Sequence, residues 1–161
     1  MLTKLARALL AAVLLAPLPG LAAEVIVVNG DPPGVGFNDP TPATPVGGNP
    51  GTTVGEQALN VFQRAADVWG GKLQSKQPIL VIAFFLPLSC NASSGVLGAA
   101  GANWYFADIP PAKGGKALTP GTWYPAALAE KITRQDIVAD PNDPFEVFAF
   151  FNSELGQPGC L

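Results

Sequence analysis

The apolar positions between residues 53 and 74 recur every three or four residues, which is the spacing of one face of an amphipathic helix. Thr53 and Glu56 form the Thr-x-x-Glu pattern of a capping box, so the helix is predicted to begin there. Gly70-Gly71 weakens its last turn. We expect this apolar face to pack against a sheet, with Trp69 in the core. The face consists of Val54, Ala58, Val61, Phe62, Ala65, Trp69 and Leu73.

Four other segments have the composition of β-strands. Val25 to Val28 is a β-branched run that ends at Asn29-Gly30. The string "ILVIAFFLPL" after Pro78 is apolar without alternation, as in a central strand covered on both faces. The string "ANWYFADI" is rich in aromatic residues, and "FEVFAFFNSEL" alternates. Its two sides are Phe145, Val147, Ala149 and Phe151 on one and Phe148 and Phe150 on the other.

Proline and glycine concentrate between residues 29 and 51, which predicts an extended arm laid over the domain. The string "YPAALAEKI" and a second capping pattern from Thr133 to Asp136 predict one or two short helices. The predicted fold class is therefore α+β: a mixed sheet of about four strands against one long helix, residues 53–74, and one or two short helices. Because a helix joins the first two strands, they are expected to be parallel neighbours.

The amino-terminal residues predict export. Lys4 and Arg7 precede an apolar run, and small residues follow at 20–23, as in a secretory signal peptide. The apolar run is too short to span a bilayer comfortably, so cleavage after Ala22 or Ala23 is expected in place of a retained anchor. The mature protein would be one secreted or periplasmic domain, residues 24–161.

Cys90 and Cys160 are the only cysteines. In an oxidising compartment they are expected to form one disulfide, which would stabilise a modest core by about 4 kcal/mol. The alternative, free thiols or a metal pair, lacks the further ligands that a zinc site needs.

Charge and chemistry exclude several function classes. Without Lys4 and Arg7, seven basic residues face twelve acidic ones and form no basic cluster, so nucleic acid and anionic membranes are not expected partners.

The chain has no histidine. This excludes a Ser-His-Asp triad and any imidazole-based metal site. The carboxylates, Asp31 and Glu146 among them, occur chiefly in turns, and turn formation explains them better than catalysis. We expect no catalytic, metal-binding or cofactor-binding residue.

Two aromatic pairs are candidates for a glycan-stacking or protein-binding face. They are Trp104 with Tyr105 and Trp123 with Tyr124. Because neighbouring residues of a strand point to opposite faces, one member of each pair can be exposed while the other packs in the structure.

Three strings carry a resemblance to a known family: "GFNDPTPATPVGGNPGTT" within the arm and helix region, "GTWYPAALAEKI", and "FNSELGQPGCL" at the carboxyl terminus. With them the chain resembles the amino-terminal part of secreted bacterial proteins that carry a protease-associated domain and a zincin-type, metzincin-like metallopeptidase core. The resemblance covers nearly all of the mature chain, including both cysteines.

The resemblance implies that a helix bearing His-Glu-x-x-His follows Cys160 in longer family members and supplies their zinc site. This chain would then be a truncated, non-catalytic amino-terminal portion that lacks zinc ligands and is inactive alone. Apolar surface around Phe148 and Phe150 would be left exposed. The alternative is a complete small binding module for a glycan or a protein partner.

Overall fold

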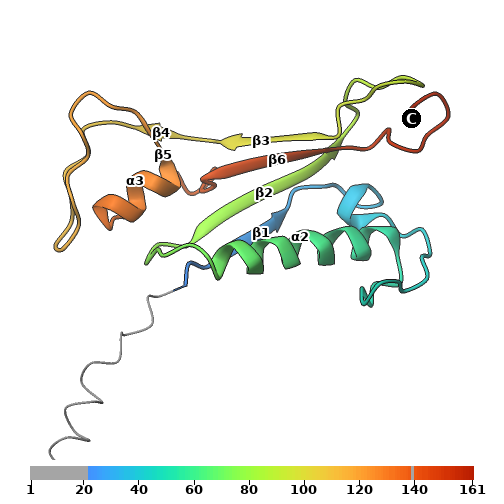
Figure 1. Cartoon of the computed structure of the whole chain (residues 1–161), viewed down its shortest axis with the longest axis horizontal. Helices are drawn as coiled ribbons and strands as arrows, with labels where there is room; N and C mark the ends of the chain where they lie inside the picture. Colours follow the sequence, from blue (N-terminus) through green and yellow to red (C-terminus); the bar gives the residue numbers. More distant parts are fainter. Residues whose placement is uncertain (1–21, 139) are drawn as a thin grey trace, which may run out of the picture.

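The computed structural model describes residues 22–138 and 140–161, so almost all of the expected signal peptide lies outside the described residues. The fold is α+β, with one four-stranded mixed sheet and one two-stranded sheet, as predicted (Figure 1). The elements are β1 Val25–Asn29, η1 Gly36–Asn38, α2 Val54–Gly70, β2 Ile79–Leu86, β3 Gly98–Ala102, β4 Tyr105–Phe106, β5 Tyr124–Pro125, α3 Ala126–Thr133 and β6 Val147–Asn152.

The main sheet has the strand order β1-β2-β6-β3. β1, β2 and β6 are parallel, and β3 runs antiparallel to β6 at the far edge. The predictions that β2 is an inner strand and that β1 and β2 are parallel neighbours are confirmed. The expectation that β2 is covered on both faces is not met, since Ala83 is its single buried residue. β3 consists only of glycine and alanine and was not predicted, because these residues have low strand propensity. The aromatic string that follows it contributes the short strand β4 instead.

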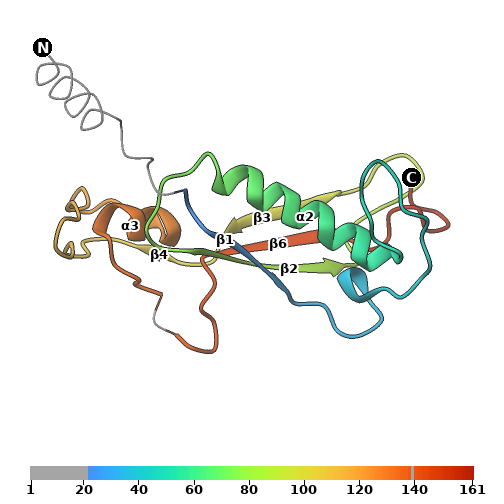
Figure 2. The same ribbon diagram turned by 90° about the horizontal axis from the view of Figure 1, so that it is seen from below.

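Helix α2 lies on one face of the sheet, and β1 is the strand it contacts most (Figure 2). The Thr53 hydroxyl accepts the Glu56 backbone N–H at 3.1 Å, which confirms the predicted start of the helix. The return bond of the capping box is shifted by one residue, since the Glu56 carboxylate accepts the Thr52 N–H. The helix ends at Gly70, earlier than expected.

The core between α2 and the sheet is a cluster of four phenylalanines. Phe37 comes from η1, Phe62 from α2, Phe85 from β2 and Phe151 from β6. Neighbouring ring centroids in this phenylalanine cluster are 5.1–6.1 Å apart, in stacked and edge-to-face pairs, as aromatic packing favours. The cluster joins the arm, the helix and the carboxyl ends of two parallel strands.

The face of α2 that meets the rest of the fold most closely is formed by small residues. Gly55, Ala66 and Gly70 are buried. A Cβ atom on Gly55 would lie 2.5 Å from the Phe37 carbonyl oxygen, and one on Gly70 would lie 2.7 Å from the Ala23 carbonyl oxygen. The prediction that Trp69 packs in the core is wrong, because its side chain is 62% exposed. Of the larger apolar residues of α2, Leu59 and Phe62 pack against the core, whereas Val61 and Trp69 are exposed.

The opposite face of the sheet carries a second row of phenylalanines. Phe84 and Phe150 stack at 6.0 Å, and Phe148 packs against Phe150 at 5.1 Å. All three are half-buried. Apolar surface was expected around Phe148 and Phe150, and there these half-buried rings partly shield one another.

The two ends of the molecule are held differently. At one end, Cys90 and Cys160 form the predicted disulfide, with a Cα–Cα distance of 5.2 Å. At the other end, α3 packs beside β4 and β5. α3 is the short helix predicted from "YPAALAEKI", and the Thr133–Asp136 capping pattern starts no second one, since Thr133 is the last residue of α3. Its hydroxyl donates to the Ala129 carbonyl oxygen at 2.8 Å, and Arg134 ends the helix in a left-handed conformation.

Candidate functional site

An apolar groove of about 770 Å³ opens beside α2, above the carboxyl ends of β2 and β6. Its floor includes the phenylalanine cluster, and Val46 and Val61 stand at its walls, 68% and 63% exposed. The volume is in the range of ligand pockets, and the carboxyl ends of parallel strands are where α/β sheets commonly bind ligands. This apolar groove is the main candidate site.

The polar groups of the apolar groove are already hydrogen-bonded within the chain. The Asn49 amide donates to the Gln57 carbonyl oxygen, and the Gln57 amide donates to the carbonyl oxygens of Thr44 and Gly51. No charged side chain lines the groove among the described residues. The groove therefore offers shape and apolar contact.

Asp31 positions the rings that form the floor of the apolar groove. Its side chain is buried, with Oδ2 accepting the Phe37 N–H at 2.8 Å and Oδ1 accepting the Phe85 N–H at 2.7 Å. The sequence placed Asp31 among turn-forming carboxylates. The structure gives it a larger role, because it ties the arm to the end of β2.

The two flanks of α2 differ in polarity. The flank on the side of the apolar groove, here called the apolar flank, lines the groove through Ala58, Val61 and Ala65, and Val54 and Trp69 continue it toward the two ends of the helix. Val54, Val61 and Trp69 are 44–63% exposed. The opposite flank is polar and consists of Glu56, Asn60, Gln63 and Asp67: Gln63 and Asp67 lie beside β1, and Glu56 and Asn60 are hydrogen-bonded to the segment that precedes α2. The predicted apolar face of the helix is therefore divided: Phe62 packs in the phenylalanine cluster, while Val61 and Trp69 are exposed.

A second candidate site is a pair of buried carboxyls, Glu130 on α3 and Glu146 just before β6. They are 1% and 4% exposed and line one small pocket of about 80 Å³ with Asp136. Glu130 Oε1 accepts the N–H groups of Ile137 and Val138 at 3.1 and 3.2 Å. The Glu146 carboxylate accepts the Leu80 N–H. Glu130 thus holds residues 137–138 in place, and Glu146 is bonded to β2.

Burial raises the pKa of Glu130 to about 7, with smaller upward contributions from Glu146 and Asp136 and opposing ones from the Ile137 and Val138 N–H groups. Burial also raises the pKa of Glu146, against the Leu80 N–H bond. The pocket has room for only a few water molecules. Glu130 can therefore hold a proton near neutral pH, and burial favours the protonated form of Glu146 as well.

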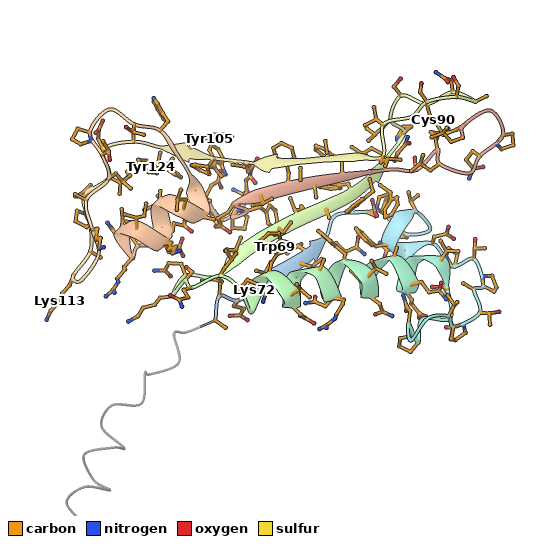
Figure 3. The ribbon with its side chains drawn as sticks, in the orientation of Figure 1. Trp69, Lys72, Cys90, Tyr105, Lys113 and Tyr124 are labelled. Atoms are coloured by element: carbon orange, nitrogen blue, oxygen red, sulfur yellow. A yellow bond between two sulfur atoms is a disulfide. The ribbon has the colours of Figure 1, made fainter. Side chains whose placement is uncertain are left out.

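The predicted aromatic pairs lie at the β4–β5 end. Tyr105 and Tyr124 are close to α3 there, whereas Trp69 is on α2 and Cys90 is at the far end (Figure 3). Trp104 and Tyr105 are 37% and 53% exposed. Trp123 is 70% exposed and Tyr124 is half-buried, so this pair divides as predicted and the Trp104 pair does not. Within the described chain, stacked pairs involve only phenylalanines.

Among residues 22–138 and 140–161, no three His, Cys, Asp or Glu side chains are grouped closely enough to hold a metal ion. None of the helices in that part of the chain combines the length and the apolarity needed to cross a bilayer.

Sequence reasoning missed the residues that matter most in these sites. Glu130 had a usable signal, since it is a single carboxylate inside the apolar pattern of "YPAALAEKI". The arm gave no signal that Phe37 would meet Phe85 and Phe151, because those contacts join distant parts of the chain.

Comparisons of the chain with protein-family models, with curated proteins and with solved structures found no match. The family resemblance therefore stays a prediction, and the function has to be argued from the residues and their geometry.

Proposed function

We propose that this chain is the non-catalytic, amino-terminal scaffold of an extracytoplasmic, zinc-metallopeptidase-like protein. In this proposal a zinc-binding helix, supplied by polypeptide outside residues 1–161, packs beside α2. The Cys90–Cys160 disulfide supports the extracytoplasmic placement, because disulfides persist in oxidising compartments.

The supporting observation is the open space next to the apolar flank. Helix α2 covers the β1 side of the sheet and contacts β1 more than any other strand, while β3 at the other side exposes Gly98 and Ala100 in register with Phe151 and Ala149 of the same face. A second helix over β6 and β3 would bury the apolar flank and fill the apolar groove. Small residues on β3 would allow it to approach closely. Helices in such pairs pack with their axes 8–10 Å apart, which side chains the size of valine and alanine permit.

The amino-acid composition indicates which part of the proposed protein supplies the zinc ligands. A catalytic zinc ion needs three protein ligands, a water and a general acid/base, and a chain without histidine supplies no imidazole. This chain would contribute the sheet and α2, and the added helix would contribute the ligands. Activity is expected only from a polypeptide that contains both.

The test is to express the gene's reading frame with whatever follows the codon for Leu161, and to measure bound zinc and peptide cleavage with and without a chelator. We expect about one zinc ion per chain and chelator-sensitive cleavage. Val61→Lys and Trp69→Lys should lower zinc occupancy, because a buried lysine disfavours helix packing. The matched control Gln63→Lys, on the polar flank, should not.

Both variants must also be studied as residues 24–161 alone, where their exposed positions predict unchanged thermal unfolding. Loss of zinc without loss of folding supports the scaffold role. A frame without a zinc-binding motif, or a longer product that binds no zinc, would refute it.

The second candidate is the binding module for a glycan or a protein, which is favoured by the exposure of Trp123 and Tyr105. Aromatic faces of this kind stack on sugar rings or anchor protein partners. Under this reading residues 24–161 unfold cooperatively and bind oligosaccharides or a protein by themselves, and Trp123→Ala weakens that binding while Trp69→Ala does not.

A further inference from the structure

The outer edge of β1 carries backbone hydrogen-bonding groups that the described chain does not use. Ile79 donates to the Glu24 carbonyl oxygen at 2.8 Å, and Gly30 donates to the Ala83 carbonyl oxygen at 2.9 Å. With the parallel register between these points, the even-numbered residues of β1 bond to β2. Val25, Val27 and Asn29 therefore direct their N–H and C=O groups away from the sheet.

This edge lacks the features that normally prevent strand addition. β1 is a run of β-branched residues ending in asparagine, with no charged residue and no proline. Natural edge strands are usually protected by lysine, proline, a bulge or a covering loop. β1 is the terminal strand of the main sheet, so no strand of the described chain pairs with its outer edge.

A groove of about 600 Å³ lies next to this edge, under the polar flank of α2. Ala66, Gly70 and Gly71 make it roomy, and Asp67 and Glu24 make it acidic, with no basic side chain in its lining. Gln63 donates to Asp67 Oδ1 at 3.0 Å, and Oδ2 has no such bond within the described chain. Every second side chain of a strand placed beside β1 would point into this groove.

We propose that the β1 edge binds an extended segment of another polypeptide by strand addition, with a basic side chain of that segment in the acidic groove beneath α2. The backbone bonds to Val25, Val27 and Asn29 provide the affinity. The groove provides the preference for lysine or arginine. This binding needs no metal and no second helix, so it stands apart from the proposed function.

The test uses the exported protein and two capped heptapeptides that alternate valine with either lysine or glutamate. The readouts are NMR titration and amide hydrogen exchange. The lysine peptide should slow exchange of the Val25, Val27 and Asn29 amides at least tenfold, while the Ile26 and Val28 amides, already bonded to β2, change little. The glutamate peptide should bind more weakly.

Two variants isolate the two contributions. Val27→Pro removes an outward N–H that β2 does not use, a position where edge strands tolerate proline, and should abolish the exchange effect. Val27→Thr keeps the backbone and should bind as the parent does. Asp67→Lys should reverse the peptide preference, and Asp67→Asn should reduce lysine-peptide affinity about two- to fivefold.

Protection confined to the amides of Val25, Val27 and Asn29 and lost in Val27→Pro supports the proposal. If Val27→Pro proves unfolded by thermal denaturation, reversal of the preference in Asp67→Lys still decides the matter. The proposal is overturned if the peptides protect other amides or none, or if the edge is occupied by a second copy of this chain, seen as concentration-dependent protection without peptide.

Discussion

The Asp31 carboxylate accepts the backbone N–H of Phe85 at 2.7 Å, across 54 residues of chain. Its second oxygen accepts the N–H of Phe37 at 2.8 Å. One buried side chain thus fixes the arm to the end of β2 and holds two of the four rings of the phenylalanine cluster in place. A carboxylate that accepts two backbone N–H groups forms stronger bonds than a neutral acceptor would.

Asp31→Asn is expected to lower the free energy of unfolding by about 1–3 kcal/mol, because an amide has one acceptor oxygen and its NH₂ group would face a backbone donor. Urea unfolding measures the change. Asp140→Asn is the matched control: Asp140 is exposed and accepts the Asn142 N–H within a turn, so its variant should unfold close to the parent. Equal effects of the two substitutions would contradict the linking role of Asp31.

Because of the raised pKa of Glu130, the free energy of unfolding is expected to fall as pH rises from about 4.5 to about 7. The Glu130 carboxyl has a pKa of about 7 in the fold, against a reference value of 4.5. In that window the unfolded chain releases a proton that the folded chain keeps, so unfolding is favoured as pH increases. The contribution is fully present below pH 4.5 and is lost above pH 7, with a size of about 2 kcal/mol. Urea unfolding at several pH values measures it.

Glu130→Gln isolates this effect because glutamine imitates the protonated carboxyl. The variant should match the parent near pH 4 and be more stable near pH 8. A constant difference between the two proteins across this range would show that Glu130 titrates normally.

The disulfide is expected to contribute roughly 4 kcal/mol, since it closes a loop between residues 70 apart in sequence. Reduction should lower the urea midpoint strongly, and the double variant Cys90→Ser with Cys160→Ser should reproduce the reduced protein. A midpoint that does not respond to reductant would mean that other contacts hold these ends together, such as the bond from the Leu161 N–H to the Asn91 carbonyl oxygen.

The sequence pattern predicted those helices and strands that the neighbouring residues along the chain define by themselves. The start of α2 follows from Thr53, and the two faces of β6 follow from strict alternation around Ala149. The sequence pattern did not predict elements that form only through contacts with distant segments. β3 is a strand because β6 offers an edge to it, and its glycine and alanine residues carry no strand signal of their own.

The candidate sites were predicted less well from the sequence than the fold was. Hydrophobic periodicity identified the most apolar side of α2, and that side includes Trp69, which is largely exposed. The same pattern correctly included Phe62, which packs in the core. It gave no signal for Gly55 and Gly70, where the chain approaches the helix backbone closely, because glycine carries little hydrophobic signal. Similarly, nothing local to Asp31 or Glu130 reveals the N–H groups that reach them from other parts of the chain.

The adjacent glycines at the end of α2 test the argument about close approach. A Cβ atom on Gly70 would lie 2.7 Å from the Ala23 carbonyl oxygen, whereas one on Gly71 would meet only carbonyl oxygens of the same helix, at 3.5 Å and beyond. Gly71 has φ −68°, which alanine adopts without strain. Gly70→Ala should therefore destabilise by about 1–3 kcal/mol, as overpacking does.

Gly71→Ala should be neutral or stabilise by up to about 1 kcal/mol, because alanine restricts the unfolded chain. Urea unfolding of both variants under the same conditions gives the comparison. If Gly70→Ala were as stable as Gly71→Ala, β1 could move away from α2 at little cost, and the small residues would not be what sets the distance between the helix and the sheet.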